Sequence, residues 1–154
     1  MGSQDLTLAY IAGFLDGDWS IFFQIVSRPD YKLKFQIRSS IAFYQDTKNQ
    51  EILKWLKGIF GVGYIRHRKT GISDYTIVEP KEVKRILELL RPYVKLKKRQ
   101  TELGLEILEK LKDKSTDNFL EICKLVDKFK QLNYSKKRTI THEVVKKILI
   151  PVET

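Results

Sequence analysis

Hydrophobic residues recur along this chain with two different spacings, and each spacing predicts one type of secondary structure. Over residues 6–16 they lie three or four positions apart, as on one face of a helix. Over residues 19–45 they alternate with polar residues, which predicts two strands around a turn that contains Pro29. We expect the two strands to cover about 19–27 and 32–45.

The same order of elements follows a second time. A helix is expected over 47–60, because Gly61 is suited to the left-handed conformation that often ends a helix. A second hairpin is expected over 63–79, since two short runs with strand character flank a glycine-containing turn. The next helix should cover 80–90 and begin at Pro80, a residue that suits the first helical position.

The rest of the chain, from residue 95 onward, predicts two helices and a short last one after a loop over 133–141. The complete order is helix, hairpin, helix, hairpin and then helices. Antiparallel strands with helices on one face make an α+β domain. We expect a single domain over residues 1–154, with C-terminal helices and a basic loop from about residue 113 onward.

One face of the predicted sheet is polar and basic. The odd-numbered residues of the second strand are mostly apolar, so its even-numbered residues point the other way. Arg, Gln and Asp side chains suit base edges in the major groove, whereas an ordinary solvated sheet face is the alternative. The residues expected to face DNA are Gln24, Arg28, Lys32, Lys34, Gln36, Arg38, Arg66, Arg68, Asp74 and Thr76.

The balance of charge favours a nucleic-acid partner. Lys and Arg number 29 against 19 Asp and Glu, a formal net charge of +10 at pH 7. Such an excess indicates a polyanion, either nucleic acid or an anionic membrane surface. No apolar run reaches the roughly 18 residues that span a bilayer, and the start lacks the apolar core of a secretory signal. The single Cys123 excludes an internal disulfide and a Cys-rich zinc site, so we expect an intracellular protein.

Two carboxylates lie where a helix disfavours them. Asp16 and Asp18 fall at the C-terminal end of the first predicted helix, where the helix dipole costs a carboxylate about 0.3–1 kcal/mol. Gly13 and Gly17 each weaken the helix by about 1 kcal/mol relative to Ala. A divalent cation would compensate, because carboxylates and free end carbonyls suit magnesium. The alternative is that Gly17 merely ends the helix and Asp18 merely opens the strand.

The segment Ile11-Ala12-Gly13-Phe14-Leu15-Asp16-Gly17-Asp18 resembles the signature of the LAGLIDADG homing endonucleases. Other segments resemble the single-motif, homodimeric branch of that family: Arg28-Pro29-Asp30-Tyr31, Gly61-Val62-Gly63-Tyr64, Ser73-Asp74-Tyr75, Lys95-Leu96-Lys97, Phe119-Leu120-Glu121 and Ser135-Lys136-Lys137-Arg138. The resemblance covers nearly the whole chain. It implies an αββαββα core whose saddle-shaped antiparallel sheet lies on DNA, with additional C-terminal helices.

The resemblance also implies a metal-dependent cut in each strand of double-stranded DNA. Asp18 matches the metal-binding acid, with help from the Gly17 carbonyl, and Gln45 and Lys97 match residues that position water and stabilise charge near the cut. The expected metal is Mg²⁺, with Mn²⁺ as an alternative and Ca²⁺ supporting binding without cleavage. A water with a lowered pKa would attack the scissile phosphate in line. The family leaves short 3′ overhangs, and no small-molecule cofactor is expected.

One chain supplies one such site, yet a duplex has two strands to cut. The resemblance therefore implies a homodimer on a long, partly palindromic target. The motif helices of the two subunits would pack together, and the expected interface residues are Ala12, Gly13, Asp16 and Gly17. Asp16 could instead cap the helix. Phosphate contacts are expected from Lys136, Lys137 and Arg138.

Two positions depart from the family pattern. Trp19 stands where the branch usually has glycine, and its ring would either pack under the helix tip or crowd the site. Asn49 stands where a basic residue is usual, although the adjacent Lys48 offers a charge. These departures leave a second function open, that of a non-cleaving binder on the same scaffold: an intron RNA maturase or a DNA-binding regulator. No membrane partner is expected.

Overall fold

The structure is a computed structural model, and it describes residues 2–132 and 140–151. The elements in chain order are α1 (Ser3–Asp18), β1 (Trp19–Ser27), β2 (Phe35–Asp46), the 3₁₀ turn η1 (Thr47–Asn49), α2 (Glu51–Phe60), β3 (Tyr64–His67), β4 (Ile72–Ile77), α3 (Pro80–Leu90), α4 (Lys98–Lys110), α5 (Thr116–Leu132) and α6 (His142–Leu149). This order confirms the expected α+β architecture with an αββαββα core followed by further helices.

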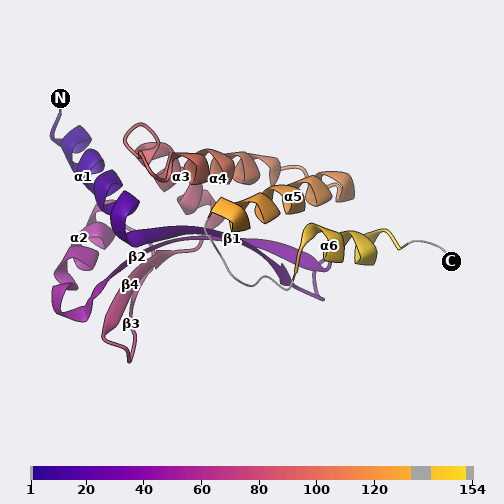
Figure 1. The fold of residues 1–154 in the computed structure, drawn as a ribbon, viewed down its shortest axis with the longest axis horizontal. Coiled ribbons are helices and arrows are strands. Elements are labelled where there is room, and N and C mark those ends of the chain that lie inside the picture. The colour runs from indigo at the N-terminus through magenta and orange to yellow at the C-terminus, as the bar shows by residue number, and fades with distance from the viewer. Residues whose placement is uncertain (1, 133–139, 152–154) are drawn as a thin grey trace.

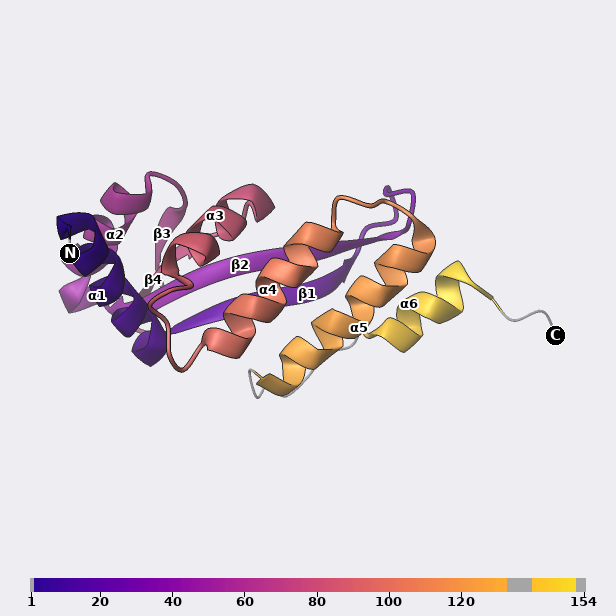
Figure 2. The same cartoon turned by 90° about the horizontal axis from the view of Figure 1, so that it is seen from above.

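The four strands form one antiparallel sheet in the order β1-β2-β4-β3. Figure 1 shows the sheet as an arch, with α3, α4 and α5 over its convex side and no helix of the described residues across its concave side. Seen from above, α4 crosses β1 and β2, and α5 lies next to α4 on the β1 side (Figure 2). α1 leads into β1 without an intervening loop, because Asp18 ends the helix and Trp19 begins the strand.

The core lies between the sheet and the helices that cover it. The β1–β2 register pairs Ile21 with Ile41, and all of the odd-numbered side chains of β1 from Trp19 to Ile25 are buried. Phe23 of β1 contacts Phe129 of α5, with ring centroids 4.9 Å apart. Alternation along the strands thus seals one face against the helices and leaves the even-numbered face outside.

The turn between β1 and β2 is longer than the sequence predicts. β2 begins at Phe35, so Lys32 and Lys34 lie in the turn and not in a strand. Lys34 has φ +65°, and the Arg28 amide donates to the Lys34 carbonyl at 2.8 Å to close the turn. Alternation assigns faces only where the backbone is extended. The expectation that Lys32 and Lys34 extend a regular row of the sheet is therefore wrong.

Most helix boundaries follow local signals, although α1 extends beyond the predicted 6–16 at both ends. Gly61 ends α2 with φ +74°, and Pro80 is the first residue of α3, as expected. The segment from Thr47 to Asn49 is a 3₁₀ turn and not the first turn of α2. Asp46 caps it, because its carboxylate accepts the Lys48 amide at 2.9 Å. Among the described residues no helix combines the length and the apolar character needed to cross a bilayer.

Gly63 lies where the backbone turns tightly into β3. Its φ is +89°, and a Cβ added there would lie 2.6 Å from the Thr76 carbonyl oxygen and 2.7 Å from Cε1 of Tyr75. Tyr75 has no room to move, because its side chain is fully buried and its hydroxyl donates to the Val62 carbonyl. Burial also raises the pKa of Tyr75 to about 12.

We predict that Gly63→Ala lowers the free energy of unfolding by more than Gly71→Ala does. Gly71 has a similar φ of +85°, but no atom lies within 4 Å of its added Cβ. Both variants lose about 1–2 kcal/mol from the left-handed backbone, and only Gly63→Ala adds overpacking of about 1–3 kcal/mol. Chemical denaturation of the two variants measures the difference, and equal losses would contradict the predicted close approach.

Candidate nucleic-acid interface and metal site

The end of α1 and the end of β2 meet at one edge of the arch. Asp18 is the last residue of α1, and the next residue, Trp19, pairs with Phe43 in the β1–β2 register. Gln45 lies two residues beyond Phe43 on β2. The fold thus brings Asp18 and Gln45, which are far apart in sequence, to the same end of the sheet.

Lys97 reaches the same place through contacts to Asp16. One carboxylate oxygen of Asp16 accepts the Lys95 amide at 2.7 Å, and the other accepts the Lys97 amide at 3.0 Å. The connection between α3 and α4 therefore lies against the last turn of α1. The three residues expected to take part in cleavage gather around this helix end.

Asp18 is exposed, and its carboxylate has no hydrogen bond or ion pair to any other described residue. The Gly17 carbonyl is one of the last four of α1, which have no donor within the helix. No group of three or more acidic, His or Cys side chains that could enclose a metal occurs within residues 2–132 and 140–151. One chain thus offers a cation a carboxylate and a carbonyl. That donor set fits Mg²⁺, which usually keeps several waters and takes phosphate oxygens from its substrate.

Trp19 packs under the helix end and does not crowd the site. Its ring is 6% exposed and lies 5.7 Å from the ring of Phe43 in a tilted arrangement. The bulky side chain therefore extends the core and leaves Asp18 exposed. Lys48 and Asn49 are both exposed, and they lie in η1, three and four residues after Gln45 in the sequence. The Oε1 atom of Gln45 accepts the Asp46 amide at 3.0 Å.

The concave face of the sheet carries the polar row that alternation predicts. Gln24 of β1 pairs with Arg38 of β2, and both are exposed. Arg66 of β3 lies opposite Asp74 of β4, and Arg68 follows just after β3. We call Gln24, Gln36, Arg38, Arg66 and Arg68 the basic face.

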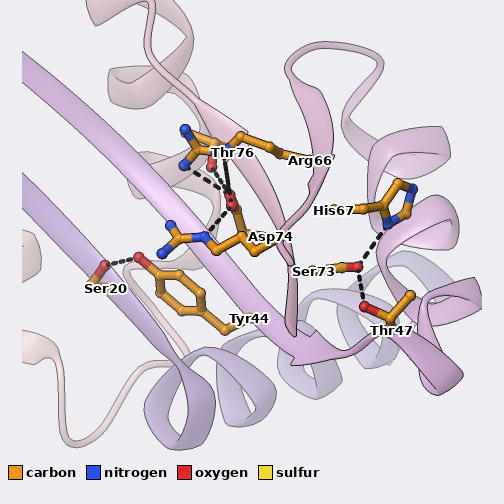
Figure 3. A network of polar contacts seen from close by, with 9 residues as sticks. Ser20, Tyr44, Thr47, Arg66, His67, Ser73, Asp74 and Thr76 are labelled. Atoms are coloured by element: carbon orange, nitrogen blue, oxygen red, sulfur yellow. Dashed lines mark hydrogen bonds and ion pairs between the residues drawn. The ribbon is translucent and has the colours of Figure 1, made fainter. Parts of the chain in front are cut away.

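Asp74 is not available to DNA in the way that the sequence indicates. Its carboxylate is fully buried and accepts hydrogen bonds from Arg66 at 3.1 Å and from Arg68 at 3.4 Å (Figure 3). Thr76 is 6% exposed and donates to the same carboxylate at 3.3 Å. The expectation that Asp74 and Thr76 face DNA is therefore corrected, because the arginines hold the Asp74 carboxylate and Thr76 is buried beside it. Hydrogen bonding to Asp74 and its negative charge raise the pKa of Arg66, whose guanidinium remains cationic.

Sequence reasoning missed Tyr44, the even-numbered residue of β2 beside Gln45. Its hydroxyl lies 3.4 Å from the Ser20 hydroxyl, and the Arg68 guanidinium lies 5.7 Å from its ring centroid. The same alternation that selected Arg38 would have placed Tyr44 on this face. Phe22 and Val26 share it too, opposite Ser40 and Gln36, but apolar residues were expected only in the core.

A second hydroxyl network lies on the other side of the same hairpin. The Ser73 hydroxyl is within 2.7 Å of Nδ1 of His67 and 2.8 Å of the Thr47 hydroxyl. Figure 3 shows these three side chains across the strands from Arg66 and Asp74. This network joins β3 and β4 to η1, and no periodicity or motif in these segments predicts it.

Arg28 lies at the far end of the sheet, where the turn leaves β1. Its guanidinium donates to Asp30 at 3.1 and 3.2 Å and to Oε1 of Gln36 at 3.0 Å, and it lies 4.3 Å from the centroid of the Tyr31 ring. The hydrogen bond to Asp30 raises the pKa of Arg28 and lowers the pKa of the Asp30 carboxyl. Lys34 donates to the Pro29 carbonyl at 3.3 Å. This end of the basic face is thus held by the chain's own contacts.

One face of α1 is exposed and carries no charge over most of its length. Its members are four residues that recur at helical spacing: Leu6, Tyr10, Gly13 and Gly17. Ala12 is completely buried within its own chain, so the expectation that it contributes to an interface is wrong. Asp16 is half-buried, and both of its oxygens accept amides of its own chain. The expected phosphate-binding residues Lys136, Lys137 and Arg138 lie outside the described residues.

The family model described as LAGLIDADG endonuclease matches residues 11–105. The DNA endonuclease I-CreI of Chlamydomonas reinhardtii is 42% identical over 144 residues, which cover 92% of this chain and 88% of I-CreI. The DNA endonuclease I-CvuI of Chlorella vulgaris is 41% identical over 145 residues, which cover 94% of this chain and 90% of I-CvuI.

Solved structures show the same arrangement. The crystal structure of I-CvuI in complex with its target in the presence of 2 mM Ca has a TM-score of 0.90 at 40% identity, covering 95% of this chain and 94% of I-CvuI. The archaeal intron-encoded homing endonuclease I-Vdi141I, complexed with DNA, shares the fold with a TM-score of 0.85 at 21% identity, covering 96% of each chain. Since the family match and both relatives span the motif helix, the sheet and the connection that carries Lys97, the chain belongs to the LAGLIDADG endonuclease family.

Proposed function

We propose that this protein is a site-specific endonuclease that binds a long, partly palindromic double-stranded DNA site as a homodimer. It hydrolyses one phosphodiester in each strand with a divalent metal and leaves short 3′ overhangs. The observation that carries the proposal is the exposed carboxylate of Asp18, which has no partner among residues 2–132 and 140–151 and lies at the same end of the sheet as Gln45 and the Lys97 segment. Because its proposed target is DNA, we expect the protein to act inside the cell, in the cytoplasm or in an organelle if an organellar genome encodes it.

Asp18 and the Gly17 carbonyl are the residues that would hold the metal, and Mg²⁺ is the ion that fits them best, with Mn²⁺ as a substitute. A divalent cation bound there supplies charge neutralisation at the phosphate and lowers the pKa of water. I-CvuI was crystallised with its target in 2 mM Ca, and with the I-CreI target in 2 mM Mg, where the DNA was not cleaved. We expect Ca²⁺ to support DNA binding by this chain without cleavage.

The chain's own groups divide the remaining work. The Lys97 ammonium stabilises negative charge as it develops on the scissile phosphate, the kind of fixed electrostatic help that enzymes supply. Gln45 orients the attacking water with its amide group, whose oxygen already accepts the Asp46 amide and is thereby held in place. No small-molecule cofactor is required by this division of roles.

The basic face reads the target in the major groove. Arg66 and Arg68 point from neighbouring positions of the hairpin and are held by Asp74, so they meet DNA with fixed guanidinium planes. Gln24 and Arg38 lie side by side across β1 and β2. Arg28 lies farther along with Gln36, and the exposed Lys32 and Lys34 of the turn contact phosphates. Asp74 acts through the arginines and not on a base.

The exposed stripe of α1 is the proposed dimer interface. Leu6 and Tyr10 are each 58% exposed near the start of α1, and Tyr10 makes an edge contact with Trp55 of α2 at 5.8 Å between ring centroids. Gly13 and Gly17 have open space where a side chain would be. Two copies of α1 would approach most closely at the glycine end. Each Asp18 would then lie near the two-fold axis, as a cut with a short overhang requires.

The second candidate function is a non-cleaving binder, either an intron RNA maturase or a DNA-binding regulator. The observation that favours it is the exposed Asn49 beside Gln45, where the family usually supplies a positive charge. The exposed Lys48 next to it offers that charge from a different angle. Selection of bound and of cleaved sites from a random DNA library, with Mg²⁺, separates the two functions, since a binder enriches only bound sites.

We predict that Asp18→Asn keeps target affinity in Ca²⁺ and loses cleavage in Mg²⁺ by a factor of about 10²–10³ or more, because it removes the charged metal ligand. Gel-shift titration and single-turnover cleavage measure the two effects. Asp5→Asn is the matched control, since it changes a carboxylate at the other end of α1 and should leave both unchanged. An Asp18→Asn enzyme that cuts at the normal rate would refute the proposed metal site.

We predict that Gly13→Leu blocks dimer formation, because a branched side chain at the centre of the stripe prevents close helix approach. The chain itself accommodates it, as no atom lies within 4 Å of an added Cβ. Sedimentation of Gly13→Leu should show monomers that retain the melting temperature of a folded chain. Glu106→Leu on the exposed side of α4 is the control for a surface leucine and should remain dimeric. A dimer of unchanged affinity in Gly13→Leu would place the interface elsewhere.

We predict that Arg66→Ala relaxes sequence preference at one base-pair position in each half-site at a cost of about 1–3 kcal/mol. Lys136→Ala should instead weaken binding to all sequences alike and reduce the salt slope by about one. Binding profiles over all single-base target variants, at two salt concentrations, distinguish the two patterns. Uniform weakening by Arg66→Ala would mean that Arg66 contacts the phosphate backbone.

A further inference from the structure

We propose that Asp16 is a positioning residue that fixes the Lys97 segment against the end of α1 that carries Asp18. This inference rests on the proposed role of Lys97 in cleavage. It assigns to Asp16 a task within its own chain, where the sequence indicates a contact to the partner subunit.

The geometry is that of a two-oxygen clamp. Oδ2 of Asp16 accepts the Lys95 amide at 2.7 Å and Oδ1 accepts the Lys97 amide at 3.0 Å. Each oxygen of the carboxylate thus holds a different amide, two residues apart in the chain. An amide side chain cannot reproduce this, because Asn offers one acceptor oxygen and would turn its own N–H donors toward the second amide.

The main chain of Lys97 is held from both sides. Its amide donates to Asp16, and its carbonyl accepts the Thr101 hydroxyl at 2.8 Å and the Thr101 amide at 2.9 Å. The segment has no regular secondary structure, and its Leu96 side chain is 76% exposed. The Leu96 side chain therefore does not anchor it in the core. The direction in which the Lys97 side chain leaves the backbone depends on these few hydrogen bonds.

The clamp also answers the electrostatic problem of a carboxylate at this helix end. The C-terminal end of α1 carries partial negative charge from its carbonyls, which disfavours a carboxylate. The two amides of the Lys95–Lys97 segment supply donors to Asp16 where the helix supplies none. Asp18, two residues on, has no such donors among the described residues and so remains free for a cation.

A second hydrogen bond joins the same two elements, so it can show whether Asp16 positions Lys97 or only attaches the connection to α1. At the other end of α1, the Tyr93 hydroxyl donates to Asp5 at 2.9 Å, and this hydrogen bond raises the pKa of Tyr93. Both links join α1 to the connection between α3 and α4. Only the link through Asp16 touches the backbone of Lys97. Tyr93→Phe, which removes the other link alone, is therefore the matched control.

The test uses the full dimeric protein and its selected DNA target. Asp16→Asn should slow single-turnover cleavage in Mg²⁺ by about 10–100-fold, the effect expected from misplacing a group by about an ångström. Its DNA affinity in Ca²⁺ should stay within about twofold, since the binding face is untouched. Tyr93→Phe should cleave at the normal rate, even if its melting temperature falls as much as that of Asp16→Asn. If Tyr93→Phe slows cleavage equally, the clamp is only an attachment and the inference is overturned.

Asp16→Glu guards against a variant that does not fold. It keeps both acceptor oxygens but moves them by one methylene, so it should cleave more slowly than the wild-type protein and faster than a folded Asp16→Asn. Wild-type cleavage by Asp16→Asn, or a slower rate for Asp16→Glu than for Asp16→Asn, would overturn the inference.

A double-mutant cycle with Lys97 identifies the route of the effect. If Asp16 acts through Lys97, Asp16→Asn combined with Lys97→Ala should cleave no more slowly than Lys97→Ala alone. Multiplied losses would overturn the inference while leaving the role of Lys97 intact. Normal cleavage by Lys97→Ala would instead refute the proposed function of Lys97, and with it the reason for the clamp.

Discussion

The pairing of β1 with β2 is the constraint on which the rest of this molecule depends. Its register sets Ile21 against Ile41 beneath the helices, and the same register sets Gln24 beside Arg38 on the opposite face. A slip of one residue would exchange the two faces completely. The apolar pairs have little freedom to slip, because α4 and α5 cover them. Burial of one face thus determines which side chains the other face offers to a polyanion.

Two arginine side chains of the basic face are also held in position by another residue of the chain. The buried carboxylate of Asp74 accepts hydrogen bonds from Arg66 and Arg68. Part of the side-chain entropy of the two arginines is therefore already lost in the DNA-free protein. The arrangement resembles the way in which Asp16 holds the backbone at Lys97. In both places a carboxylate is used to orient a cation, and Asp18 is the acid left exposed at the edge of the face.

The sequence predicts most of this fold because its signals are local. Alternation defines the strands, Gly61 ends α2 with a left-handed residue, and Pro80 begins α3. The positive φ of Lys34 was not predicted, because lysine is not a residue type that indicates a left-handed backbone. The burial of Asp74 depends on how two arginine side chains fold over it. The contacts of Asp16 join residues 79 and 81 positions apart, and no pattern within one segment encodes them.

The direct junction of α1 and β1 has a mechanical consequence. Asp18 and Trp19 join the two elements without a linker, and the buried Trp19 ring restricts bending between α1 and β1. In a dimer that forms through α1, each subunit would then rotate as a rigid body about the pair of α1 helices. A small rotation there would displace the hairpin tip at Arg28 more than Arg66, since displacement grows with distance from the pivot. The outermost base pairs of the target would therefore be the most sensitive to any substitution that tilts the two helices.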